Sequence, residues 1–155
     1  MIVKSYEFDE SKKQNSNFFL IYGKNEGLQN EIVEKYFLQN FEGTKNKYDE
    51  YEFIRNYDEI LNGILSQSLF EGNELIIISQ VTDKILKNIT EIINKEISQT
   101  IFLLKSDSLD KKSKIRALFE KDKNLTCIPV YEDDSKNLGF IVQNFSKKNN
   151  IKLSQ

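Results

Sequence analysis

The first place in the chain where chemistry could occur is a segment with two glycines, which follows a short apolar run. It reads Gly23-Lys24-Asn25-Glu26-Gly27-Leu28-Gln29-Asn30. Glycine-rich loops that bind phosphate have four residues between these glycines, then Lys and Ser or Thr to hold the phosphates and Mg²⁺. Here only three residues separate the glycines, Leu28 and Gln29 follow the second one, and Glu26 would repel phosphate. The segment therefore predicts a strand-to-helix turn that does not hold ATP.

Other catalytic and metal-binding arrangements are missing as well. After the apolar run 75–78, where an ATPase would place an acidic pair for Mg²⁺ and water, the chain has Ser79 and Gln80. The chain has no histidine, so its serines lack the usual activating base and zinc lacks a common ligand. The dinucleotide pattern Gly-x-Gly-x-x-Gly and the acidic residues of a response regulator are absent too. We therefore predict no catalytic, nucleotide-binding or metal-binding residues, and no cofactor.

The remaining reactive groups have structural interpretations. Cys127, the only cysteine, lies in an apolar run. Free cysteines are among the most buried residue types, so we interpret it as a core residue. A lone cysteine also excludes an internal disulfide, which suits the cytosol. Asp133 and Asp134 lie beside an expected helix start, where carboxylates complement the helix dipole.

The elements that position these residues alternate between short apolar runs and amphipathic stretches. We predict strands at residues 18–22, 51–54, 75–78, 101–104 and 125–130. Apolar residues at helical spacing predict helices at residues 28–37, 57–65, 85–93 and 115–119. Asn56, Asp83 and Asp110 are the expected helix caps. This order predicts an α/β fold with a mostly parallel sheet and helices on both faces.

A shift in composition divides the chain near Tyr131. The acidic run Glu132-Asp133-Asp134 is followed by a predicted helix, which is marked by Leu138, Ile141, Val142 and Phe145. We place a first domain at residues 1–131. Residues 132–155 are the expected beginning of a small helical second domain, which the chain does not complete.

Composition also limits the function classes. The chain has 155 residues, of which 39% are hydrophobic, and this suits one packed domain with a piece of a second. Its formal net charge of -2 gives nucleic-acid binding no support. No apolar run approaches the roughly 20 residues that cross a bilayer, and the N-terminus lacks a signal-peptide pattern. We therefore predict a cytoplasmic protein without a membrane partner.

Two large apolar residues, Leu69 and Phe70, lie in a connection where polar residues are usual, within Ser68-Leu69-Phe70-Glu71-Gly72. In one interpretation they close a helix end over the core, because Leu69 follows Leu65 by one helical turn and large apolar residues are mostly buried. In the other they are exposed anchors for a pocket on a partner. The residues alone favour the core interpretation.

A second notable feature is the basic run at residues 111–123, which carries six basic and two acidic residues. Such a run is most often a solvated helix face. The alternative is contact with phosphate or with an acidic neighbouring subunit.

Four stretches of the chain together resemble the delta subunits of bacterial DNA polymerase III clamp loaders. They are Phe18 through Glu26, Ser68-Leu69-Phe70 with residues 75–78, Leu109 through Arg116, and Pro129 through Asp134. In order, they are similar to the family's opening strand and turn, its clamp-binding corner and next strand, a helix start, and the passage into the second domain. The turn departs from the family, which often has acidic residues where Lys24 and Asn25 stand.

The resemblance implies an AAA+-like fold, that is, a degenerate P-loop NTPase fold that has lost its nucleotide site. It implies a non-catalytic subunit of the DNA polymerase III holoenzyme, a complex with DNA-directed DNA polymerase (nucleotidyltransferase) activity. Such a subunit binds the sliding clamp (the beta subunit) and helps to open it for loading onto DNA during replication. The apolar pair that enters the clamp maps onto Leu69 and Phe70, which reverses the preference for the core interpretation.

The same resemblance implies the other partners. These are the remaining clamp-loader subunits and, through the complex, DNA; the chain by itself is expected to be a monomer. Two other functions stay open on the sequence: a P-loop-like nucleotide-binding NTPase, and a nucleic-acid-binding module that uses the basic 111–123 face.

Overall fold

The structure is a computed structural model of the chain, and it describes residues 1–67, 69–70, 72–131 and 143–149. In these residues, strands form one parallel sheet in the order β2-β3-β4-β1-β5. The strands are β1 (Phe18–Tyr22), β2 (Thr44–Asp49), β3 (Glu74–Ser79), β4 (Thr100–Ser106) and β5 (Thr126–Pro129). The predicted α/β fold with a parallel sheet is therefore confirmed.

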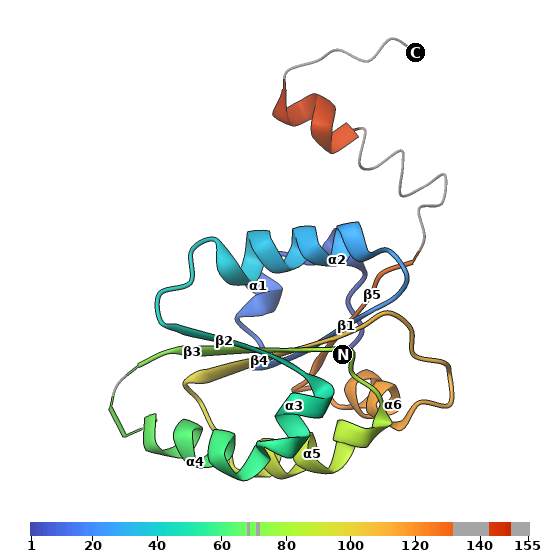
Figure 1. Ribbon diagram of the computed structural model, residues 1–155. Helices are drawn as coiled ribbons and strands as arrows, with labels where there is room; N and C mark the ends of the chain where they lie inside the picture. Colours follow the sequence, from blue (N-terminus) through green and yellow to red (C-terminus); the bar gives the residue numbers. More distant parts are fainter. Residues whose placement is uncertain (68, 71, 132–142, 150–155) are drawn as a thin grey trace.

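Helices cover both faces of the sheet, as predicted (Figure 1). One face carries α1 (Glu10–Lys13), α2 (Glu26–Val33) and the π-helical turn η2 (Glu34–Leu38) that continues α2. The opposite face carries α3 (Glu50–Arg55), α4 (Tyr57–Gln67), α5 (Leu86–Asn94) and α6 (Lys114–Lys121). Two short 3₁₀ helices, η1 (Ser5–Glu7) and η3 (Asp83–Ile85), complete this part of the chain.

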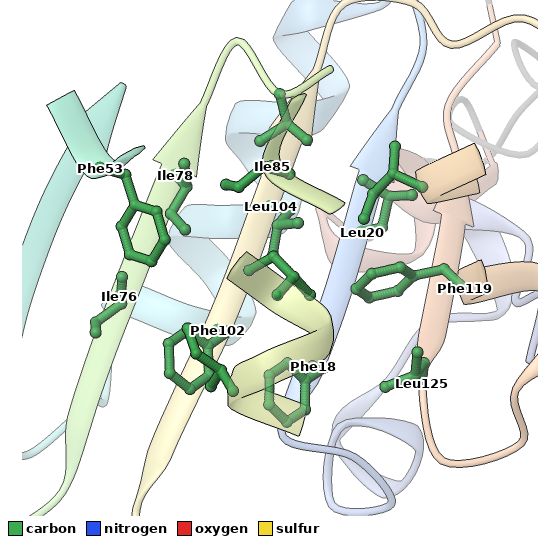
Figure 2. Close-up of a cluster of buried hydrophobic side chains, with 14 of the residues drawn as sticks. Phe18, Leu20, Phe53, Ile76, Ile78, Ile85, Phe102, Leu104, Phe119 and Leu125 are labelled. Carbon is green, nitrogen blue, oxygen red and sulfur yellow. The ribbon is translucent and has the colours of Figure 1, made fainter. Parts of the chain in front are cut away.

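The central strands are buried because helices lie against both of their faces. All five residues of β1 are buried, and alternate side chains along the strands enter two separate apolar clusters. Figure 2 shows the cluster beneath α3 to α6, in which the rings of Phe18 and Phe102 stack with centroids 4.9 Å apart. Strands buried on both faces have continuous apolar sequences, so the runs at 18–22, 75–78 and 101–104 predicted them correctly.

The second strand was predicted at the wrong place. Residues 51–54 belong to α3, whose N-cap Asp49 accepts a hydrogen bond from the N–H of Glu52 at 2.8 Å. The strand is instead β2, with the sequence Thr-Lys-Asn-Lys-Tyr-Asp, and none of its residues is fully buried. Because β2 is an edge strand, charged and polar side chains suit it and it shows no apolar pattern.

Two of the predicted caps act differently from expectation. Asp83 does not cap the helix that follows it. Its carboxylate instead supplements the N-cap of α6 from across the fold, because it accepts hydrogen bonds from Ser113 Oγ at 2.7 Å and from the N–H groups of Lys114 and Ile115 at 3.0 Å. These bonds lower the pKa of Asp83, and the bond from the N–H of Ile115 has the largest effect. The N-cap of α6 is Ser113 and not Asp110, whose carboxylate accepts from the N–H of Lys112.

The third predicted cap, Asn56, lies between α3 and α4. Its carbonyl oxygen accepts a hydrogen bond from the N–H of Ile60 at 3.0 Å, which is the first main-chain bond expected from a residue at the N-cap position of α4.

The predicted second domain lies mostly outside the described residues. Residues 143–148 are helical, which agrees with part of the helix expected there, and Phe145 is exposed. Asp133, Asp134, Leu138, Ile141 and Val142 lie outside the described part, so the boundary near Tyr131 stays a prediction. Among the helices that are described, none is both long enough and apolar enough to cross a membrane.

Gly23 provides a test of this packing, because it turns the chain from β1 into α2 against β5. Its φ is +138°, and a Cβ atom there would lie 1.7 Å from the carbonyl oxygen of Val130. We therefore expect Gly23→Ala to lower the free energy of unfolding in urea by about 2 kcal/mol or more. Gly63 in α4 is the control, because a Cβ there meets no atom within 4 Å. Gly63→Ala should raise stability by about 0.5–1 kcal/mol; equal effects at both positions would contradict the described turn.

Candidate functional site

The crevice where ligands bind in open α/β sheets lies at the carboxyl ends of the strands, at the point where the connections diverge to opposite faces. In this sheet that point lies between β1 and β4. The chain leaves β1 through α2 on one face and leaves β4 toward α6 on the other (Figure 1). Gly23 follows β1 at this crevice, and Ser106 ends β4.

The side chain of Gln29 closes this crevice. Gln29 is only 2% exposed, and its Nε2 donates hydrogen bonds to the carbonyl oxygens of Gly23 at 2.7 Å and Ser106 at 3.0 Å. The N–H of Gly23 also donates to Ser106 O at 3.1 Å. Gln29 stands where a phosphate-binding loop has Ser or Thr, and here it joins the ends of two strands.

The turn before α2 is short and internally bonded. Only residues 23–25 separate β1 from α2, and the side chain of Asn25 accepts a hydrogen bond from the N–H of Leu28 at 3.1 Å. The first turn of α2 is thus capped by the protein itself. This is the strand-to-helix turn that the sequence predicted.

Acidic and thiol groups near the sheet serve the structure. The carboxylate of Glu50 is buried and accepts hydrogen bonds from the N–H of Thr82 at 2.7 Å and from its Oγ1 at 2.8 Å, which joins α3 to the segment after β3. Cys127 is fully buried, as predicted, and burial raises its pKa to about 12. Within the described ranges, no cluster of three or more His, Cys, Asp or Glu residues could hold a metal ion.

Leu69 and Phe70 project from the opposite, amino-terminal edge of the sheet, in the connection from α4 to β3. Their exposed fractions are 80% and 79%, so neither side chain packs on the core. Leu65, one helical turn before Leu69, is already 37% exposed. The apolar face of α4 therefore leaves the core before the chain reaches Leu69. The interpretation that Leu69 and Phe70 close the helix end over the core is wrong. Ser68 and Glu71 lie outside the described residues.

The backbone that carries this pair continues from α4. The N–H of Leu69 donates to the carbonyl oxygen of Ser66 at 3.2 Å, and the N–H of Phe70 donates to that of Gln67 at 2.9 Å. These two bonds continue the last turn of the helix and present both side chains beyond its end.

Hydrogen bonds join both the start and the end of this connection to Thr44, the first residue of β2. The carbonyl oxygen of Asn73 accepts a hydrogen bond from the N–H of Thr44 at 3.0 Å, and Gln67 Nε2 donates to Thr44 Oγ1 at 3.3 Å. A Cβ atom at Gly43, where φ is +148°, would lie 2.2 Å from Asn73 O, so only glycine permits this approach. The connection that carries residues 69 and 70, which we call the Leu69–Phe70 corner, is therefore bonded to β2 at Gln67 and at Asn73.

Glu74, which the sequence did not single out, begins β3 just after this corner. Its side chain is 5% exposed. Its Oε1 accepts a hydrogen bond from Asn46 Nδ2 at 2.7 Å, but its Oε2 has no hydrogen-bond partner among the described residues. Burial raises the pKa of this carboxyl group, against the lowering effect of the Asn46 bond.

Arg116, in the basic run 111–123, makes contacts within the fold. Arg116 forms an ion pair with Glu120 at 2.7 Å, donates to the carbonyl oxygen of Leu109 at 3.1 Å, and lies over the ring of Tyr22. The five lysines of the run are exposed. This exposure agrees with the interpretation of the run as a solvated helix face.

Comparison of the sequence with protein-family models and with curated proteins found no match. What the chain does must therefore be inferred from its own residues.

The role of Gln29 can be tested by substitution. Gln29→Ala removes two buried hydrogen bonds and leaves two carbonyl oxygens without this donor, so we expect the free energy of unfolding to fall by about 1–3 kcal/mol in urea denaturation. Gln39→Ala is the matched control, because Gln39 is exposed; it should change stability by less than about 0.5 kcal/mol. If Gln29→Ala were equally neutral, the crevice would not depend on this side chain.

The buried carboxyl group of Glu74 predicts a dependence on pH. Because the pKa of Glu74 is raised in the folded state, its protonated carboxyl group contributes to the free energy of unfolding. This contribution is fully present below the unfolded pKa of about 4.3 and is lost as pH rises through the folded pKa. Glu74→Gln keeps an acceptor for Asn46 and removes the charge. We expect this variant to melt at a higher temperature than the parent at pH 7.

The difference in melting temperature between parent and Glu74→Gln should shrink as pH falls toward 4, measured by circular dichroism. The control is Glu59→Gln, since Glu59 is an exposed residue of α4. A Glu74→Gln difference that stayed constant with pH would show that charge burial is not its cause.

Proposed function

We propose that this chain is the clamp-binding domain of a clamp-loader delta subunit, in which Leu69 and Phe70 enter an apolar pocket on the sliding clamp. The observation that carries this proposal is the exposure of two adjacent large apolar side chains, 80% and 79%, in a connection that is bonded to β2 at Gln67 and Asn73. Large apolar residues that project from a fixed backbone can fill a partner's pocket with little loss of backbone entropy. The sequence resemblance implies a clamp contact at the same two residues.

The arrangement of the sheet supports an AAA+-like, degenerate P-loop NTPase fold. The order β2-β3-β4-β1-β5 differs from the 3-2-1-4-5-6 order of dinucleotide-binding folds and from the 2-1-3-4-5 order of flavodoxin-like folds. The crevice between β1 and β4, where such folds bind ligands, is occupied by Gln29. A subunit that relies on its neighbours for ATP would have no need of this site, so the Gln29 closure favours clamp binding over the NTPase alternative.

The energetics limit what the corner can do. Burial of both side chains could contribute roughly 3–6 kcal/mol before the costs of association. This is enough for specific attachment but does not by itself break a closed ring. If the pocket is more accessible in an open clamp, preferential binding to that form shifts the population toward opening. ATP in neighbouring clamp-loader subunits would then control when the corner is free.

The proposal is tested by surface-plasmon measurement of binding between the 155-residue chain and the sliding clamp of the same organism. Leu69→Ala and Phe70→Ala should each raise Kd by about 30-fold or more, which corresponds to the roughly 2 kcal/mol of an interface hot spot. Because both side chains are exposed, the melting temperatures of these variants should stay close to that of the parent.

Tyr51→Ala is the matched control. Tyr51 is 73% exposed, but it lies in α3 after the carboxyl end of β2, at the other edge of the sheet. Its removal should leave clamp binding unchanged. The proposal fails if the parent does not bind, or if Tyr51→Ala weakens binding as much as Phe70→Ala does.

A further inference from the structure

An apolar groove is lined by residues of α5 and α6. Both helices lie on the sheet face opposite α2 (Figure 1). Its volume is about 570 Å³, and its lining includes Leu86 and Thr90 of α5 and Ala117 and Leu118 of α6, which we call its floor. Leu86 and Leu118 are only partly buried, although both pack against the core cluster. The groove therefore presents apolar surface between α5 and α6.

The rim of the groove is positively charged. Lys114 and Lys121 line it at the two ends of α6 and are exposed, and neither forms an ion pair within the described part of the chain. They are seven residues apart, which corresponds to about 10 Å along a helix. Two cationic groups thus bracket a floor that is about two helical turns long.

Acidic groups near the groove reduce this charge but do not reverse it. Asp122 also lines the groove, so its lining residues include two lysines and one carboxylate. The carboxylate of Asp83 accepts hydrogen bonds from the N–H groups of Lys114 and Ile115 at 3.0 Å, but it does not line the groove. On α5, Glu91 lies 4.0 Å from Lys95 and is paired with it. The lining residues consequently keep an excess of positive charge.

We propose that this groove binds an acidic amphipathic helix of a partner protein. Apolar residues at positions i, i+3 and i+4 of such a helix would lie on Leu86, Ala117 and Leu118, in the helix-in-groove mode of recognition. Asp or Glu residues that flank this stripe would pair with Lys114 and Lys121, which fixes the position of the helix and favours acidic over basic partners. The proposal does not rest on clamp binding, since the groove and the Leu69–Phe70 corner share no residue.

The apolar floor distinguishes this proposal from nucleic-acid binding. A phosphate backbone would contact the lysines but would leave Leu86 and Leu118 unused, and no aromatic side chain lines the groove on which a base could stack. An acidic helix uses both the floor and the rim.

The test is fluorescence polarisation with a labelled synthetic peptide of about four helical turns, locked as a helix by a lactam bridge, with leucines on one face and glutamates on both sides of them. We expect a Kd below about 100 μM for the full chain. Lys114→Glu/Lys121→Glu should raise Kd at least about tenfold. Lys111→Glu/Lys112→Glu makes the same change in net charge outside the groove, and it should alter Kd by less than about twofold.

Ala117→Gln, which fills the floor without changing charge, should also weaken peptide binding. The melting temperature of each variant is measured alongside; if Ala117→Gln does not fold, the two charge-reversed variants still decide the question. The proposal is overturned if the parent does not bind the peptide, or if both lysine pairs weaken binding equally. It is also overturned if a DNA oligonucleotide binds at Lys114 and Lys121 and the peptide does not, or if sedimentation shows that a second copy of the chain occupies the groove.

Discussion

The structure depends on the burial of β1, β3 and β4 on both faces of the sheet. Their side chains fill two apolar clusters, one beneath α2 and η2 and the other beneath α3 to α6. Main-chain N–H and C=O groups in such a layer have no access to water, so the neighbouring strands must pair them, and this fixes the strands against one another. The parallel arrangement then gathers all carboxyl ends at one edge and all amino ends at the other.

These two edges have different consequences for function. At the carboxyl edge, Gln29 bonds the ends of β1 and β4 together and occupies the crevice that ligands use in related architectures. At the amino edge, the hydrogen bonds of Asn73 and Gln67 to Thr44 hold the connection that presents Leu69 and Phe70. At one edge the strand ends are bonded together, and at the other two large apolar side chains are exposed. This contrast is the basis on which we propose a binding role.

The sequence predicted the parts of the fold that follow from continuous apolar runs and missed those decided by tertiary contacts. The strands at 18–22, 75–78 and 101–104 are apolar because both of their faces are covered. The edge strand β2 has no such pattern, so its place was mistaken. Asp83 supplements the N-cap of α6 from across the fold, a role that local spacing cannot reveal. Exposure of Leu69 and Phe70 could not be decided by composition, because the same residues suit a helix end packed on the core. The burial of Glu74 beside polar Asn73 also gave no local signal.

Contact between the Leu69–Phe70 corner and the clamp is tested most directly by hydrogen–deuterium exchange of the chain with and without the sliding clamp. If the corner is the contact, peptides that contain Leu69, Phe70 and Asn73 exchange more slowly in the complex, while the turn at residues 23–25 and helix α6 do not change. Slower exchange at that turn or along α6, with no change at the corner, would contradict clamp binding through Leu69 and Phe70.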